Sequence, residues 1–299
     1  MADNGLVTEA GGDPTVGYES RATLELVRLM NQADATVPGA VAAAAPAIAD
    51  AVDAIAERLR SGGRLVYVGA GSSGLLAALD AFECEATFST PPGVVVALVA
   101  GGVSAPALAQ AAAEDDRDAG ARDLRALDVG PADAVVGVSA SGTTPYVVGA
   151  LEAARAAGAL TGCVVAASGS TLGELVEHEI AVVVGPEFLA GSTRLKAGTA
   201  QKLVLNTIST VAMIRLGKTY GNLMVDVAAA NEKLAARVRR IVATASGAPG
   251  DQVDDALAAA EGDARVAIVS LLAGVDAATA RQRLDRSERS IAAALELAE

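Results

Sequence analysis

The stretch "GRLVYVGAGSSG", residues 63–74, indicates the fold of this chain. A short apolar run rich in β-branched residues and bounded by glycines is typical of a buried strand. The glycines and serines that follow it are typical of a turn into a helix. A second stretch of the same design, "DAVVGVSASGTTP", occupies residues 133–145. The two stretches therefore predict two strands that each run directly into a helix.

Strand and helix patterns alternate along most of the chain. Further strand patterns occur at residues 93–101, 160–167 and 179–185. Apolar residues at helical spacing predict helices at about residues 23–32, 41–60, 73–83, 105–120, 145–157 and 193–216. Strands that alternate with helices of this length form βαβ units. The sequence therefore predicts an α/β fold in which helices flank both faces of a central parallel sheet.

The pattern changes after Gly247, where short helical segments are separated by Gly-Asp and Gly-Val-Asp breaks. Asp263 and Asp276 precede two of these segments and are predicted to cap them. We therefore expect a small all-helical domain at the C-terminal end. The predicted division is a flexible arm at 1–20, a main domain with N-terminal helices at 21–228, a connecting helix at 229–246 and the helical domain at 247–299.

Composition limits the classes of function. The net charge of −13 argues against nonspecific binding to nucleic acid, and it means that an anionic substrate must be held by local donors. The chain shows no uninterrupted apolar run of about 18 residues and no secretion signal, so we expect no membrane span. Two cysteines do not make a disulfide framework. A cytoplasmic protein is therefore expected.

Three loops are predicted to bind a phosphate group: residues 68–74, 138–145 and 185–202. Each places small hydroxyl residues where a strand leads into a helix, and exposed N–H groups and the helix dipole suit an anion there. One such loop is more often an ordinary helix cap, but several at one sheet edge favour a ligand crevice. The expected binding residues are Gly71, Ser72, Ser73, Ser139, Ser141, Thr143, Thr144, Ser192, Thr193 and Lys196.

The motifs favour a sugar phosphate over a nucleotide. The chain has no G-x-x-x-x-G-K-[ST] loop, and no ribose-binding acid is placed convincingly downstream of residues 69–74. Two carboxylates stand out near the predicted loops. Glu83 lies beside Cys84 in "ALDAFECEATFST", and Glu114 begins the acidic run "EDDRD". Either could be a solvated charge at a helix end or an acid-base group beside a bound anion.

Several segments resemble the N-acetylmuramic acid 6-phosphate etherase family, whose members have the sugar-isomerase (SIS) fold. The similarity runs from about residue 15 to the C-terminus, and "GSTRLKAGTAQKLVLN" is its most specific segment. The other segments include "GRLVYVGAGSSG", "DAFECEATFSTPP", "VSASGTTPYVVGALEAARAAGALT" and "RLGKTYGNLMVDV". The resemblance implies an SIS-type three-layer sandwich with a small C-terminal helical domain. It also implies a homodimer with sites near the subunit interface, and no metal or redox cofactor.

The resemblance further implies a lyase that cleaves the D-lactyl ether of N-acetylmuramic acid 6-phosphate in cell-wall amino-sugar recycling. The products are N-acetylglucosamine 6-phosphate and D-lactate. Carried onto this chain, the family's acid-base carboxylates fall on Glu83, our first choice for proton transfer, and on Glu114.

Some positions depart from the family pattern. Leu75 and Thr143 stand where arginines are expected, Phe82 replaces a small residue, and Glu85-Ala86 replaces two prolines. Two alternatives therefore stay open. One is an SIS-type isomerase or related lyase that acts on another sugar phosphate. The other is a non-catalytic sugar-phosphate sensor that regulates a kinase or a promoter, although the first 60 residues contain no basic cluster for binding DNA.

Overall fold

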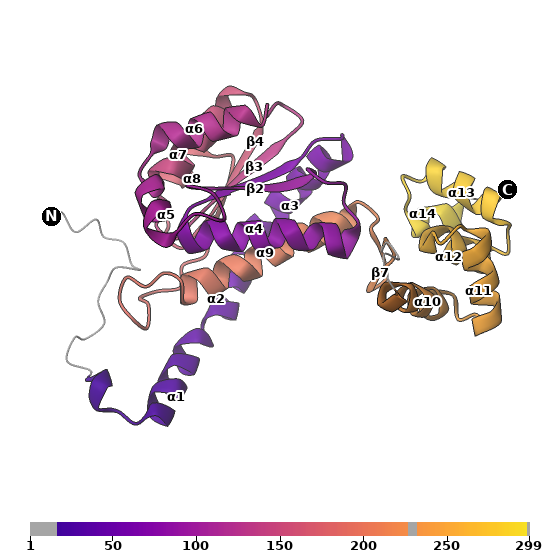
Figure 1. The fold of residues 1–299 in the computed structure, drawn as a ribbon, viewed down its shortest axis with the longest axis horizontal. Coiled ribbons are helices and arrows are strands. Elements are labelled where there is room, and N and C mark those ends of the chain that lie inside the picture. Colours follow the sequence, from indigo (N-terminus) through magenta and orange to yellow (C-terminus); the bar gives the residue numbers. More distant parts are fainter. Residues whose placement is uncertain (1–16, 227–231, 298–299) are drawn as a thin grey trace. The chain divides into compact units, whose positions relative to one another are not determined.

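The computed structural model describes residues 17–226 and 232–297. Most of the predicted N-terminal arm lies outside these residues. The chain forms two compact units (Figure 1). The first unit contains residues up to 82 together with 93–209, and the second contains residues 83–92 and 210–299. The divisions that the sequence suggests at residues 21, 229 and 247 stay predictions.

The first unit is built on a five-stranded parallel sheet in the order β2-β1-β3-β4-β5. Its strands are β1 (Leu65–Gly69), β2 (Val95–Val99), β3 (Ala134–Ser139), β4 (Leu160–Val165) and β5 (His178–Ala181). Every residue of β1, β3 and β4 is buried, as expected of parallel strands covered on both faces. The predicted α/β fold with a central parallel sheet is therefore confirmed.

Helices cover both faces of this sheet (Figure 1). One face packs against α7 (Pro145–Ala156), which in turn packs on α6 (Arg117–Ala126), and Val66, Val135 and Leu151 belong to the apolar core between them. The other face is covered by α3 (Ala45–Arg60), α4 (Gly71–Phe88) and α9 (Lys196–Arg215). The remaining helical segments of this part of the chain are η1 (Tyr18–Ser20), α1 (Thr23–Asp34), α2 (Val37–Ala43), α5 (Ala107–Glu114) and α8 (Thr171–Leu175).

Two of the predicted helices are each divided in two. The helix expected at 41–60 changes direction at Ala44, between α2 and α3. The helix expected at 105–120 stops after α5 because Asp116 caps α6, where its carboxylate accepts a hydrogen bond from the N–H of Ala119. The helix expected from Thr193 begins at Lys196.

The second unit is rich in helices. It contains a short hairpin of β6 (Thr219–Tyr220) and β7 (Leu223–Met224), followed by α10 (Glu232–Ser246), α11 (Gly250–Ala259), α12 (Ala264–Ala273), α13 (Ala277–Arg286) and α14 (Ile291–Glu296). The predicted caps are confirmed. Asp263 accepts from the N–H groups of Arg265 and Val266, and Asp276 accepts from that of Thr279. Arg265 is buried and pairs with Asp226.

No single helix within the described residues is long and apolar enough to cross a membrane. One bent pair, Thr23–Ala43 with Ala45–Arg60, meets the requirement by length and composition only.

Candidate active site

The strand order places the candidate site at the carboxyl ends of β1 and β3. These strands are neighbours, and the chain continues from β1 to β2 on one side and from β3 to β4 on the other. Open parallel sheets bind their ligands at such a switch point. The loop after β1 supplies Gly71, Ser72 and Ser73, and the end of β3 with the loop that follows supplies Ser139, Ser141, Thr143 and Thr144. Two of the three predicted loops therefore meet at one sheet edge.

The turn from β1 into α4 depends on close packing of glycines. A Cβ atom on Gly69 would lie 2.7 Å from the Cα of Gly74, and one on Gly74 would lie 2.8 Å from the backbone of Gly69. Gly71 between them has a φ of +50°, in the left-handed region that favours glycine. The spacing is that of G-x-G-x-x-G, and it lets the helix begin directly after the strand. The first N–H groups of α4 therefore lie at the edge of the sheet.

The loop between β3 and α7 carries a chain of hydroxyl groups. The N–H of Gly142 donates to Ser139 Oγ at 3.1 Å, and Ser139 Oγ lies 2.8 Å from Thr144 Oγ1. Thr144 Oγ1 donates to Glu114 Oε1 at 3.4 Å. Ser139 and Thr144 are buried, whereas Glu114 is half-buried at the end of α5. One of the two predicted carboxylates is thus held beside the predicted hydroxyl loop.

Glu83 is placed differently. It is exposed near the end of α4, in the segment 83–92 that belongs to the second unit, and Cys84 beside it is buried. The residues that the first unit brings together therefore include Glu114 and the two hydroxyl loops, but not Glu83.

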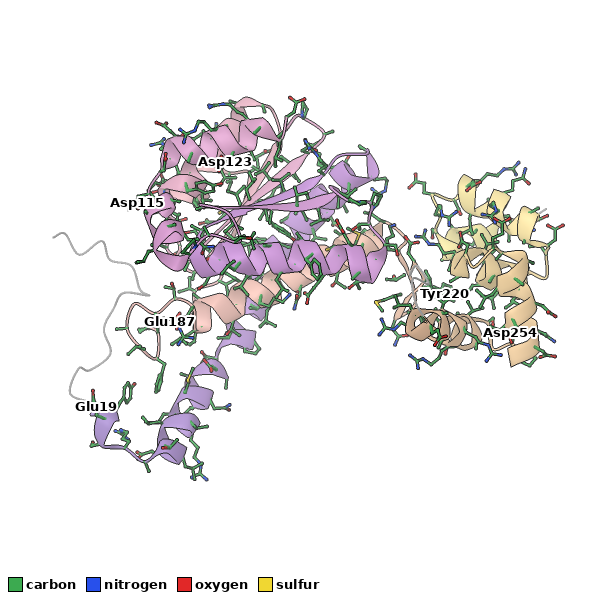
Figure 2. The ribbon with its side chains drawn as sticks, in the orientation of Figure 1. Glu19, Asp115, Asp123, Glu187, Tyr220 and Asp254 are labelled. Atoms are coloured by element: carbon green, nitrogen blue, oxygen red, sulfur yellow. The ribbon has the colours of Figure 1, made fainter. Side chains whose placement is uncertain are left out.

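In the third predicted loop, the basic residue Lys196 forms its hydrogen bonds within the protein. Glu187, labelled in Figure 2, is buried and accepts hydrogen bonds from the N–H groups of Lys196 and Ala197, each at 2.9 Å. The buried Lys196 ammonium donates to the carbonyl oxygen of Val184 at 2.7 Å. Ser192 and Thr193 lie in the turn before α9. The first N–H groups of α9 are thus occupied by a carboxylate that the sequence analysis did not select. The sequence feature that could have identified Glu187 is an acidic residue shortly before the start of a helix.

Side chains that no sequence motif singled out join α4 and α9 to the sheet. Tyr67 of β1 and Ser209 of α9 both donate to the buried Asp80 carboxylate of α4, at 3.1 Å each. Ser73 donates from Oγ to Gln201 Oε1 of α9 at 3.0 Å. These contacts fix the start of α4, and with it the loop after β1.

Two side chains of the first unit, Tyr146 and Cys163, have shifted pKa values. Burial raises the pKa of Tyr146 well above its usual range, and the Asp123 carboxylate, which accepts from its hydroxyl at 2.7 Å, adds to the effect. Burial, together with the nearby Glu179, raises the pKa of the Cys163 thiol to about 12. Both groups therefore stay neutral at ordinary pH, and neither is a base or a nucleophile.

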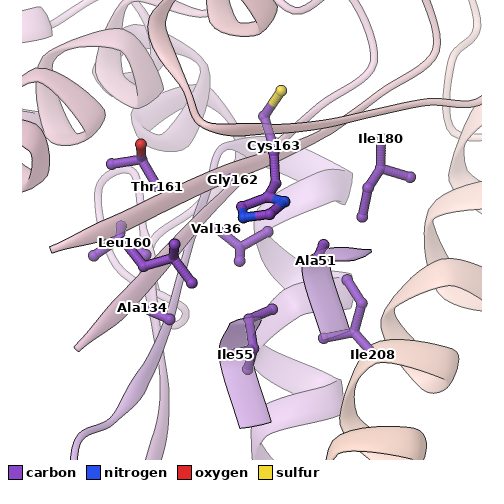
Figure 3. Close-up of a pocket in the computed structure, with 12 residues that line it drawn as sticks. Ala51, Ile55, Ala134, Val136, Leu160, Thr161, Gly162, Cys163, Ile180 and Ile208 are labelled. Carbon is purple, nitrogen blue, oxygen red and sulfur yellow. The ribbon is translucent and has the colours of Figure 1, made fainter. Parts of the chain in front are cut away.

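A small apolar cavity lies away from these loops, between the sheet and the helices α3 and α9 (Figure 3). Its lining includes Ile55, Val136, Ile180 and Ile208, and its volume is about 10 Å³. This is at most the room for one water, so the cavity is a packing defect and not a substrate site. His178 is half-buried and also lines the cavity. No three His, Cys, Asp or Glu side chains cluster as metal ligands in the part of the chain that the structure describes.

Comparison with known proteins gives two kinds of match. Residues 47–155 match the family described as the glucokinase regulatory protein N-terminal SIS domain. The chain is 56% identical to the N-acetylmuramic acid 6-phosphate etherase of Streptomyces avermitilis, over 97% of this chain and 93% of the relative. It is 57% identical to the protein of that name from Rubrobacter xylanophilus, over 93% of each.

The structural neighbours agree on the fold. A phosphoheptose isomerase from Francisella tularensis superposes with a TM-score of 0.51 at 20% identity, covering 65% of this chain and all of that one. At these identities the likeness shows the SIS fold alone, and it confirms that the central sheet and its helices have the predicted arrangement.

Proposed function

The chain belongs to the N-acetylmuramic acid 6-phosphate etherase family, and from this premise we propose that it cleaves the D-lactyl ether of N-acetylmuramic acid 6-phosphate. The products are N-acetylglucosamine 6-phosphate and D-lactate, and the enzyme is a carbon–oxygen lyase. The observation that carries the proposal is identity of 56–57% to etherases over at least 93% of the chain. The hydroxyl loops at the switch point of the sheet support it, because they suit a phosphorylated sugar.

The reaction requires a base and an acid. A base removes the proton at C2 of the open-chain sugar, the electron pair of that bond forms the C2=C3 double bond, and the C3–O bond to lactate breaks. An acid protonates the departing lactate oxygen, and water then adds across the double bond, with its oxygen on C3 and a proton on C2. We assign the first proton transfer to Glu83 and the second acid-base role to Glu114. Positioned carboxylates can do both.

The geometry of the first unit supports this role for Glu114. The hydrogen bonds that run from the N–H of Gly142 through Ser139 and Thr144 end at its carboxylate, so the group is oriented by the loop for which we propose phosphate binding. We propose that Ser72 and Ser73 bind the phosphate together with the first N–H groups of α4. We propose the same role for the hydroxyls of Ser139, Ser141, Thr143 and Thr144. Because the net charge of the chain is −13, its overall field does not attract an anionic substrate, and these local donors must bind the phosphate.

An altered substrate preference is the second proposal, and one observation favours it. Leu75 and Thr143 occupy exposed positions beside the two loops, where the family pattern has arginines. A charged hydrogen bond contributes about 1.5–3 kcal/mol, so the loss of two cations weakens recognition of a substrate with both phosphate and carboxylate. The binding of a sugar phosphate that lacks the lactyl carboxylate would be weakened less.

We also propose that the protein is a cytoplasmic homodimer. Leu75, Leu79 and Phe82 form an apolar stripe along α4, with exposed fractions of 42%, 42% and 73%. They are spaced by four and three residues and so lie on one face of the helix. A second copy of the chain is the occupant that family membership favours for this stripe.

The primary test is lactate release from N-acetylmuramic acid 6-phosphate. The unaltered protein should release D-lactate, and Glu83→Gln should lower kcat by about 10²–10⁴-fold because it removes a proton-transfer group. Glu114→Gln should also lower kcat. Glu85→Gln is the matched control, since it changes a second exposed acid on the same helix that points to another face.

No lactate release by the folded, unaltered protein would contradict the etherase proposal. Equal losses in Glu83→Gln and Glu85→Gln would contradict the assignment of Glu83. In the first case, the same preparation should be screened for the isomerisation of other sugar phosphates.

A further inference from the structure

Gln201 is a buried polar residue that the reaction scheme does not use. It lies in the second turn of α9, and its side chain is 2% exposed. Its Oε1 accepts a hydrogen bond from Ser73 Oγ at 3.0 Å, whereas its buried Nε2 has no hydrogen-bond partner among the described residues. A buried donor without a partner costs about 1–3 kcal/mol. Such a cost in a native protein calls for an explanation.

The direction of the Ser73 hydroxyl bears on phosphate binding. A hydroxyl has one hydrogen, and here Ser73 directs it to Gln201 Oε1. A phosphate oxygen is only an acceptor at this position, so Ser73 must redirect its hydrogen in order to bind it. Gln201 would then have an oxygen facing the oxygen of Ser73, with no hydrogen between them.

A half-turn of the Gln201 amide removes this conflict. The two orientations of a glutamine amide occupy nearly the same space, with oxygen and nitrogen exchanged. After the half-turn, Nε2 donates to Ser73 Oγ while Ser73 donates to the phosphate. Hydrogen bonds in such a chain polarise and strengthen one another. Nε2 therefore gains a partner when an anion binds, and Oε1 takes its place at the buried position that has no partner.

We propose that Gln201 is a positioning residue for the phosphate site, and that its amide reverses when phosphate binds so that Ser73 becomes a donor. The inference rests on the proposed role of Ser73 in phosphate binding. It also explains how a site without the two family arginines can strengthen a neutral hydroxyl contact.

The test is a double-mutant cycle read by the binding of inorganic phosphate. Calorimetric titration of the full-length protein gives the dissociation constant for the unaltered chain, Gln201→Met, Ser73→Ala and the double variant. We expect Gln201→Met to weaken phosphate binding about fivefold when Ser73 is present, the range for one lost hydrogen bond. In the Ser73→Ala background the same change should alter binding less than about twofold, because the effect passes through the hydroxyl.

Thr207→Val is the matched control. It removes a polar group from the same helix, but the Thr207 hydroxyl donates only to the carbonyl of Leu203 in the preceding turn. Phosphate affinity should not change. Equal weakening by Gln201→Met in both backgrounds, an unchanged affinity in the single variant, or no saturable phosphate binding to the unaltered protein would overturn the inference.

Two further measurements keep the test decisive if Gln201→Met does not fold. Gln201→Glu retains the shape, but its ionised form only accepts hydrogen bonds. It should therefore weaken phosphate binding more at high pH and less as the carboxyl is protonated, relative to the unaltered protein at each pH. In nuclear magnetic resonance spectra, the side-chain amide pair that disappears in the Gln201 variants should shift on phosphate addition.

Phosphate binding and lactate release fail independently. A protein that binds phosphate through Ser73 and Gln201 but releases no lactate would refute the etherase proposal and leave this inference standing. A protein that releases lactate but shows no coupling between the two residues would support the etherase proposal and refute this inference.

Discussion

At the scale of single residues, we propose that the two departures from the expected family pattern, Leu75 and Thr143, affect how the substrate is bound. Leu75 and Thr143 are exposed, so a longer side chain at either position would not disturb the core. Thr143 Oγ1 donates to Ser141 Oγ at 3.0 Å, within the loop that carries the Ser139–Thr144 hydroxyl chain. An apolar side chain and a short hydroxyl thus stand where the resemblance predicts two cations.

Restoring a cation should strengthen binding of a doubly anionic substrate. We expect Thr143→Arg, and separately Leu75→Arg, to lower KM for N-acetylmuramic acid 6-phosphate about tenfold, in line with one charge-assisted hydrogen bond. Thr143→Gln is the control for added length without charge. A KM that stays the same in both arginine variants would show that these positions do not face the substrate.

At the scale of elements, strands were predicted better than helix ends. The strands β1, β3 and β4 are apolar runs rich in β-branched residues, and burial on both faces explains that pattern. The strand expected at residues 179–185 is shorter in the structure, where β5 ends at Ala181. Helix boundaries were missed where alanine-rich sequence continued through a break, as at Ala44. Asp116 was hidden in an acidic run, although it is a helix cap.

The candidate site shows the same limit. The hydroxyl loops were predicted because each is a local pattern at a strand end. Gln201 lies 128 positions from Ser73, and Glu187 caps a helix that starts nine residues later. Contacts of this kind depend on the packing of α9 against α4 and on the course of a loop, which periodicity and composition do not encode.

The apolar stripe on α4 provides a prediction for one element. Phe82 is 73% exposed, and burial of a phenylalanine against a partner contributes roughly 1.5–3 kcal/mol. We expect Phe82→Asp to convert a dimer into a monomer, measured by sedimentation equilibrium. Leu272→Asp, a change at another exposed apolar residue, should leave the mass unchanged. A monomeric unaltered protein would contradict the proposed dimer.

At the scale of the whole molecule, a few carboxylates of this acidic chain are paired with arginines and backbone N–H groups. Asp133 joins the starts of β1 and β3. It accepts from the backbone N–H groups of Arg64 at 2.8 Å and Gly130 at 3.0 Å, and from the Arg64 guanidinium. Burial acts to raise the pKa of Asp133, but the Arg64 guanidinium and these N–H groups outweigh it and hold the pKa below its ordinary value of 3.8. Asp263 in the second unit follows the same pattern, with Arg289 as its cation and a pKa that is also lowered.

These two carboxylates should contribute to the response of stability to acid. A carboxyl whose folded pKa is depressed binds protons more readily in the unfolded chain, so its stabilisation is present above the unfolded pKa and is lost as pH falls through the folded pKa. We expect Asp133→Asn to lower the urea midpoint at neutral pH, with the difference from the unaltered protein shrinking below about pH 4. The comparison is made at each pH because the molecule, with a net charge of −13, also gains stability as its other carboxylates are neutralised and mutual repulsion falls.

Asp118→Asn, at an exposed acid on α6, is the control and should show no such pH dependence. A difference between Asp133→Asn and the unaltered protein that stays constant from neutral pH to about pH 3 would mean that the ion pair and its hydrogen bonds do not contribute through the charge of Asp133.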